Sequence, residues 1–208
     1  MKLRDSRQDF VQSWLTEMPE GVGAIELFDM LEWHIRDRIR SGSTPEKLDS
    51  HWRKIMGSQT VYYWYERDGN IVLAAEFSPQ PQALVVNAVA RNPGYRGAPW
   101  ATDLYELVLN DTQRSLRIHS DTQLSDAGLE LWKRFVRQGH RVSVYDRQNP
   151  GQSFHTVTEP DELEKYFQPD NRDYRRYQYV LSEASDYPEL VSVFNTRRMR
   201  ELSGLSLE

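Results

Sequence analysis

The stretch Ala83-Leu-Val-Val-Asn-Ala-Val-Ala-Arg-Asn-Pro-Gly-Tyr-Arg-Gly-Ala-Pro-Trp-Ala101 decides the fold of this chain. Its first eight residues form a nearly continuous apolar run, which predicts a strand covered on both faces at the centre of a sheet. Residues 101–110 repeat their apolar side chains at helical spacing. The loop between them carries Gly94 and Gly97 and points backbone N–H groups and the positive end of a helix dipole at one place. The stretch therefore predicts a phosphate site at the start of this helix.

The surrounding pattern predicts an α/β (α+β) fold with a mixed central sheet, an N-terminal antiparallel meander, a C-terminal parallel part and helices on both faces. Upstream we expect helices around residues 10–15, 28–39 and 45–56, an aromatic strand over 60–66, a turn at Asp68-Gly69 and a returning strand over 70–77. Downstream we expect strands over 115–119, 141–145, near 154 and over 174–182, and helices over 125–139, 160–167 and from 187.

Composition sets outer limits on function. The 208 residues, 38% of them apolar, suffice for one domain over residues 1–186 followed by a helix or tail over 187–208. Without cysteine, disulfides, thiolate zinc sites and cysteine nucleophiles are excluded. We expect a cytoplasmic protein without a membrane span or secretory signal. The net charge of −5 disfavours nucleic acid as a partner, and His34 and His51 lack metal-ligand spacing, so no metal is assigned.

The predicted element order, together with residues 89–108, resembles the GCN5-related N-acetyltransferase (GNAT) family. Pro93, Tyr95, Arg96 and Gly97 match the family's frequent Pro-x-Tyr-Arg-Gly run. The resemblance implies acetyl-CoA as cofactor and transfer of its acetyl group to a primary amine of a small molecule or protein, by direct attack on the thioester. The stretches after residue 125 are similar to phage-encoded members of the family. This similarity implies that the protein is encoded by a bacteriophage.

The resemblance also implies which residues hold the cofactor. The backbone at Val89 and Arg91 would pair with the pantetheine arm. The pyrophosphate would face the N–H groups of Arg96, Gly97, Ala98, Trp100 and Ala101. Pro99 stands where the family has a glycine and removes one donor, which weakens binding by about 1.5–3 kcal/mol if the lost bond is to a charged group. The alternative is an ordinary strand-to-helix connection in which the glycines serve only the turn.

The candidate acids and bases lie mainly at strand ends. Residues 125–139 resemble the family helix that carries a tyrosine as general acid, but Trp132 and Phe135 stand in its place and neither donates a proton to a thiolate. Carboxyl ends of parallel strands are where such sheets bind ligands, and this favours Ser120, Tyr145 and His119 over Asp121 and Asp146. Glu76, with Glu66 as a second choice, is the candidate base for the amine. For each, a solvated surface role is the alternative.

Three functions fit these features of the sequence. The first is an acetyl-CoA-dependent N-acetyltransferase. The second is a non-catalytic binding module of the same fold, favoured by Pro99 and the missing tyrosine. The third is a phage-type enzyme that modifies nucleobases, against which the acidic charge counts. A fold-level resemblance does not indicate which acceptor is used.

Overall fold

The computed structural model describes residues 24–113, 115–121, 124–149, 155–167 and 176–182. The predicted helix around residues 10–15 and the predicted C-terminal helix from 187 lie outside the described residues, and the domain boundary at 186 remains a prediction. Among the described helices, none is both long and apolar enough to cross a bilayer.

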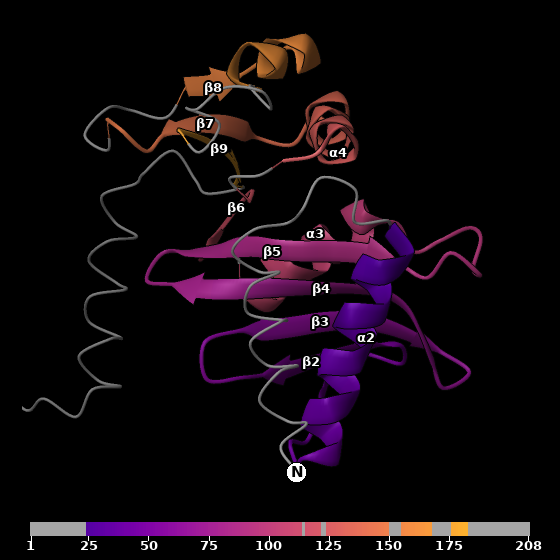
Figure 1. The fold of residues 1–208 in the computed structure, drawn as a ribbon. Helices are drawn as coiled ribbons and strands as arrows, with labels where there is room; N and C mark the ends of the chain where they lie inside the picture. The colour runs from indigo at the N-terminus through magenta and orange to yellow at the C-terminus, as the bar shows by residue number, and fades with distance from the viewer. Residues whose placement is uncertain (1–23, 114, 122–123, 150–154, 168–175, 183–208) are drawn as a thin grey trace, which may run out of the picture.

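The fold is mixed α/β, with one nine-stranded sheet in the order β1-β2-β3-β4-β5-β6-β9-β7-β8 (Figure 1). The strands are β1 (Glu46–Lys47), β2 (Trp52–Met56), β3 (Val61–Arg67), β4 (Asn70–Gln80), β5 (Ala83–Arg91), β6 (Arg117–His119), β7 (Val142–Asp146), β8 (His155–Val157) and β9 (Tyr177–Leu181). The helices are α2 (Ala24–Arg40), α3 (Ala101–Asp111), α4 (Asp126–Arg137) and the 3-10 helix η1 (Pro160–Tyr166).

The antiparallel meander from β2 to β5 confirms the predicted strands and turn. Asp68 (φ 51°) and Gly69 (φ 75°) supply the positive φ values of the two-residue hairpin between β3 and β4. The helix predicted over residues 45–56 is wrong, because this segment forms β1 and β2 at the sheet edge. Trp52 and Ile55 bury their side chains on opposite faces of the sheet, and pairing with β3 overrides the weak helical spacing.

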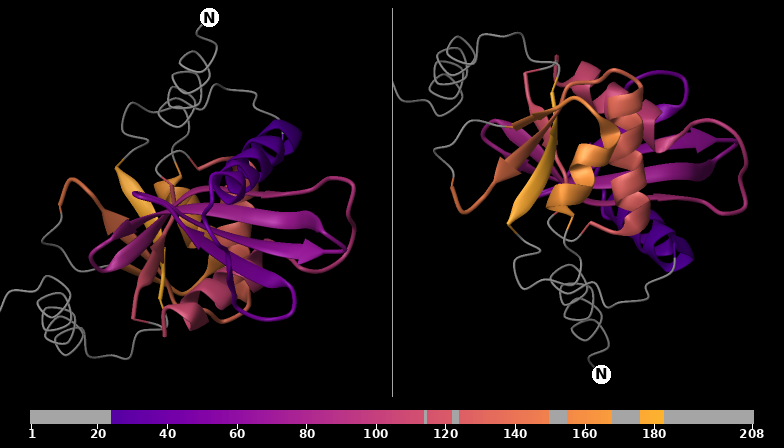
Figure 2. Two further views of the ribbon diagram at one scale, coloured as in Figure 1. Left: turned by 90° about the horizontal axis from the view of Figure 1, so that it is seen from below. Right: turned by 90° about the horizontal axis from the view of Figure 1, so that it is seen from above.

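Helices cover both faces of the sheet, as both views of Figure 2 show. Helix α2 packs on β4 and β5 from one side, whereas α3 and α4 lie on the other. The aromatic strand β3 supplies both cores, since Tyr62 and Trp64 are buried under α2 while Tyr63 is buried on the α3 and α4 side. This alternation is what a strand covered on both faces requires.

The parallel part of the sheet is shorter than the alternating pattern suggests. Strand β6 runs parallel to β5 over three residue pairs, from Ala83–Arg117 to Val85–His119. The predicted strand at 141–145 forms β7, but it does not lie beside β6. Strand β9 inserts between them and is antiparallel to both. Consequently β5 and β6 are paired as strands only at the beginning of β5.

Phe135→Ala is expected to lower the free energy of unfolding by about 3–5 kcal/mol, because a buried ring leaves a cavity. The Phe135 ring is fully buried and contacts Tyr105 and Trp132. Urea unfolding measures the loss, with Met56→Ala as a control that should stay within about 0.5 kcal/mol, since Met56 is exposed. Equal losses in the two variants would contradict this core.

Candidate functional site: a cleft between β5 and α4

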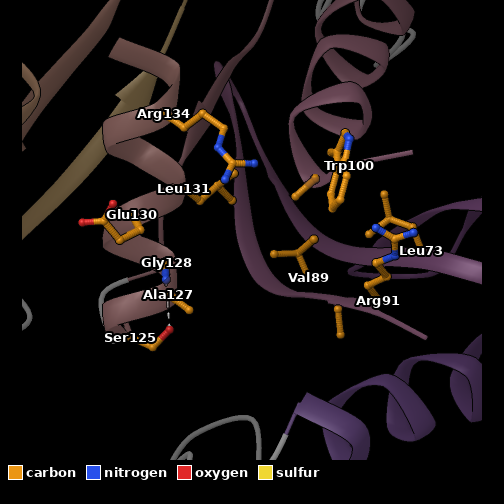
Figure 3. Close-up of a pocket in the computed structure, with 12 residues that line it drawn as sticks. Leu73, Val89, Arg91, Trp100, Ser125, Ala127, Gly128, Glu130, Leu131 and Arg134 are labelled. Carbon is orange, nitrogen blue, oxygen red and sulfur yellow. Dashed lines mark hydrogen bonds between the residues drawn. The ribbon is translucent and has the colours of Figure 1, made fainter. Parts of the chain in front are cut away.

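A cleft of about 370 Å³ opens where β5 extends past the end of β6 (Figure 3). Its walls come from Leu73 of β4, the last residues of β5, the start of α3 and the first three turns of α4. The lining residues are Leu73, Val89, Ala90, Arg91, Trp100, Ala101, Ser125, Ala127, Gly128, Glu130, Leu131 and Arg134.

Local sequence explains how α4 comes to form one wall. Ser125 caps the helix by accepting a hydrogen bond from the Gly128 N–H at 3.2 Å, as its position in the sequence predicts. Trp132 and Phe135 anchor the helix in the core below. The opposite helical face then turns Leu131 and Arg134 toward β5 (Figure 3). The cleft thus has apolar walls and a cationic side chain on α4.

The predicted phosphate loop lies at the mouth of this cleft. Gly97 adopts a positive φ of 81°, which explains the glycine. The Trp100 N–H donates to the Asp103 carboxylate at 2.6 Å and is therefore engaged within the protein. Within the described part of the chain, the N–H groups at 96–98 and 101 have no hydrogen-bond acceptor. The loop retains donors for an anion on both sides of Pro99.

Arg91 contributes a second cationic group from β5. Its guanidinium donates to the Gly97 carbonyl oxygen and lies 4.8 Å from the centroid of the Trp100 ring. Its Nε atom is buried and has no partner within the described residues. Arg91 and Arg134 therefore supply positive charge from two walls, and Arg67 tethers the loop from outside by donating to the Ala98 carbonyl oxygen.

A β-bulge in β5 lies just before the cleft, where Asn87 is the extra residue opposite β4. The Asn87 amide donates to Glu76 Oε1 at 2.9 Å and pairs with the Ser78 hydroxyl at 2.9–3.0 Å. Glu76 is 1% exposed and lies beneath α2. The predicted base is therefore a buried carboxylate that holds the bulge.

His34 of α2 is the group beside the second oxygen of Glu76. Its Nδ1 lies 3.6 Å from Glu76 Oε2, and neither atom has a hydrogen-bond partner in the described structure. Burial alone would raise the pKa of Glu76, but contacts with His34, Asn87 and Tyr62 outweigh it and hold the pKa below 4.5. Burial beside this carboxylate raises the pKa of Tyr62 to about 12. Glu76 is therefore ionised at neutral pH.

His119 and Tyr145 come together where β5 and β6 part, with their ring centroids 6.0 Å apart. Burial lowers the pKa of His119 below 6.5, so its imidazole is neutral near pH 7. Ser120 is 2% exposed, donates to the Asp121 carbonyl oxygen and accepts from the Tyr179 N–H, so its hydroxyl is engaged inside the sheet.

Asp146 and Glu66 have structural partners of their own. Asp146 forms a two-point ion pair with Arg176, which lowers its pKa. Glu66 accepts a 3.4 Å hydrogen bond from the indole of Trp64. No group of three or more metal-ligating side chains occurs among residues that the structure describes.

Sequence reasoning missed His34, Asn87, Leu131 and Arg134. Asn87 is the one polar residue in an otherwise apolar run, and this was the available signal for the bulge. The others are helical residues whose neighbours are set by packing between distant elements, and no local pattern marks them.

Comparisons with known proteins are sparse. No protein-family model and no curated protein matches the chain. Among solved structures, the chain is similar to a predicted acetyltransferase of the GNAT family from Bacteroides thetaiotaomicron, with 9% identity and a TM-score of 0.37 over 99% of this chain and 97% of that chain. A similarity this distant establishes neither family nor function.

Glu76→Gln is expected to destabilise the protein at neutral pH by about 1–3 kcal/mol, because the amide cannot replace a carboxylate that accepts from buried donors. The folded-state pKa of Glu76 is lowered, so its contribution is complete above the unfolded value near 4.5 and is lost as pH falls through the folded pKa. The difference between wild type and variant should therefore shrink on acidification.

Urea unfolding at neutral and acidic pH measures this difference. Asp29→Asn is the control, because Asp29 is exposed on α2 and its loss should matter little at either pH. A difference for Glu76→Gln that grows on acidification would contradict an ionised, buried Glu76.

Proposed function

We propose that the protein is an N-acyltransferase that takes an acetyl group from acetyl-CoA and delivers it to a primary amine. The observation that carries the proposal is the cleft between β5 and α4, whose lining is largely apolar and which holds Arg91 and Arg134 beside Trp100 of the phosphate loop. A thioester on a long, flexible arm with a phosphate-rich end has this distribution of polarity.

The residues present fit such a cofactor. Val89 and Leu131 provide apolar contact for a pantetheine arm. On the side of β5 that faces β6, the residues after Val85 pair with no strand in the described structure. Arg91, Arg134 and the N–H groups of residues 96–98 and 101 provide donors for phosphates. Glu130 also lines the cleft, but its carboxylate lies 3.4 Å from Lys133 Nζ, which offsets its charge.

Acetyl-CoA supplies an activated acyl group, and the chain must supply proton transfer. An amine attacks only as the free base, so its proton needs an acceptor. Glu76 is buried, whereas the side chain of His34 is 12% exposed. Both lie on the α2 face of the sheet, opposite α4, so we assign His34 to receive the proton of an amine that approaches β5 from this face, and Glu76 to stabilise the resulting imidazolium.

The leaving thiolate needs a proton donor in place of the missing helix tyrosine. Tyr145 and His119 lie where β5 and β6 part, and we assign the donor to the Tyr145 hydroxyl, because the neutral imidazole of His119 has no acidic proton to give near pH 7. Ser120, with its hydroxyl engaged by Tyr179, fixes β6 against β9 and so positions His119.

A non-catalytic binding module is the second candidate. It is favoured by the burial of Trp132 and Phe135, which leaves α4 without a proton donor in the core below the cleft. It predicts the same ligand without turnover.

Acetyl-CoA at 100 times its Kd is expected to stabilise the protein by about 2.7 kcal/mol, seen as a rise in melting temperature. Arg134→Glu should remove most of this rise, because it reverses a charge in the cleft. Arg40→Glu is the matched control, since the Arg40 side chain is 65% exposed at the end of α2, lies outside the lining of the cleft and should leave the rise intact.

Thiol release from acetyl-CoA with a panel of primary amines and lysine peptides then separates the two candidates. Release above the uncatalysed rate supports the transferase, and binding without release supports the module. No rise in melting temperature at millimolar acetyl-CoA would refute both.

A further inference from the structure

Trp100 is an unusually exposed aromatic residue for its place in the fold. It precedes the first residue of α3 and lines the cleft, yet it is 49% exposed. Tryptophan is usually highly buried, because its large apolar surface is costly to leave in water. An open indole at the mouth of a cleft is a surface available to a ligand.

The indole is held in a fixed orientation. Arg91 lies 4.8 Å from the ring centroid, and its guanidinium is anchored by the Gly97 carbonyl oxygen. The backbone is fixed as well, because the Trp100 N–H donates to Asp103. Residue 100 thus contributes its side chain to the cleft, whereas its N–H is already engaged.

The surroundings of the ring select the class of ligand. Arg91 covers one side of the indole, and Arg134 points toward it across the cleft (Figure 3). A flat aromatic surface between two guanidinium groups suits a ligand that is itself flat and aromatic and that carries phosphates, because bases stack on indole and arginine pairs with phosphate. An acyl-phosphopantetheine arm alone would leave the ring unused.

We propose that Trp100 is a stacking platform for the base of an adenine nucleotide, with Arg91 and Arg134 facing its phosphates. The inference rests on the proposed function and extends it, because it names the residue that selects which acyl donor the protein accepts. The protein recognises the nucleotide half of an acyl-CoA and discriminates against acyl groups carried on phosphopantetheine without a nucleotide.

The test is calorimetric binding of CoA and of 4′-phosphopantetheine, which share the pantetheine arm and one phosphate. Wild type should bind CoA at least tenfold more tightly. Trp100→Ala should weaken CoA binding by about tenfold, within the range that base stacking contributes, and leave phosphopantetheine binding unchanged. Trp100→Phe should retain most of the preference. Trp33→Ala is the matched control, since Trp33 is 41% exposed on α2 and lies outside the cleft lining.

Tryptophan fluorescence provides a readout that does not require the alanine variant to fold. CoA should quench wild-type emission, phosphopantetheine should not, and the quenching should be absent in Trp100→Phe and present in Trp33→Ala. Equal loss of both ligands in Trp100→Ala, or quenching that persists in Trp100→Phe, would overturn the stacking platform. Failure of wild type to bind either ligand would instead refute the proposed function.

Discussion

The constraint on which the rest of the structure depends is the short pairing of β5 with β6. The two strands run parallel for three residue pairs and part after Val85 and His119, while β5 continues to Arg91. An unpaired strand edge inside a domain must be satisfied by other groups, and α4 closes over the gap without filling it. The cleft is therefore a consequence of strand length and not of a special loop.

The bulge at Asn87 lets β5 contribute side chains to both cores and to the cleft. Before it, Val86 belongs to the core under α3 and α4, and after it Ala88 belongs to the core under α2. The bulge shifts the alternation of the strand, so that Val89 and Arg91 reach the cleft. The buried Glu76 carboxylate holds this irregularity from the α2 face. The cleft and the buried hydrogen bonds of Glu76 therefore meet at Asn87 in β5.

Residues 83–101 could be interpreted from sequence because their signals are local. The apolar run, the glycine turn at Gly97 and the helix after Trp100 each follow from a few neighbouring residues. Segment 45–56 could not be interpreted in this way, since its strands form by pairing in the sheet, β2 with β3 and β1 with β2. The insertion of β9 between β6 and β7 likewise depends on pairing between strands that are far apart in the sequence. The same division holds for the site: the loop was predicted, whereas the α4 wall with Arg134 depends on how distant elements pack.

We propose that an acyl-CoA binds in the cleft between β5 and α4, which opens where β5 and β6 part. Backbone amide NMR of the full chain during titration with acetyl-CoA tests this most directly. Binding in this cleft should shift signals saturably in residues 86–91, 96–102 and 125–134, while the signals of β1 and β2 at the far edge of the sheet stay in place. No saturable shift, or shifts confined to segments outside the cleft, would contradict it.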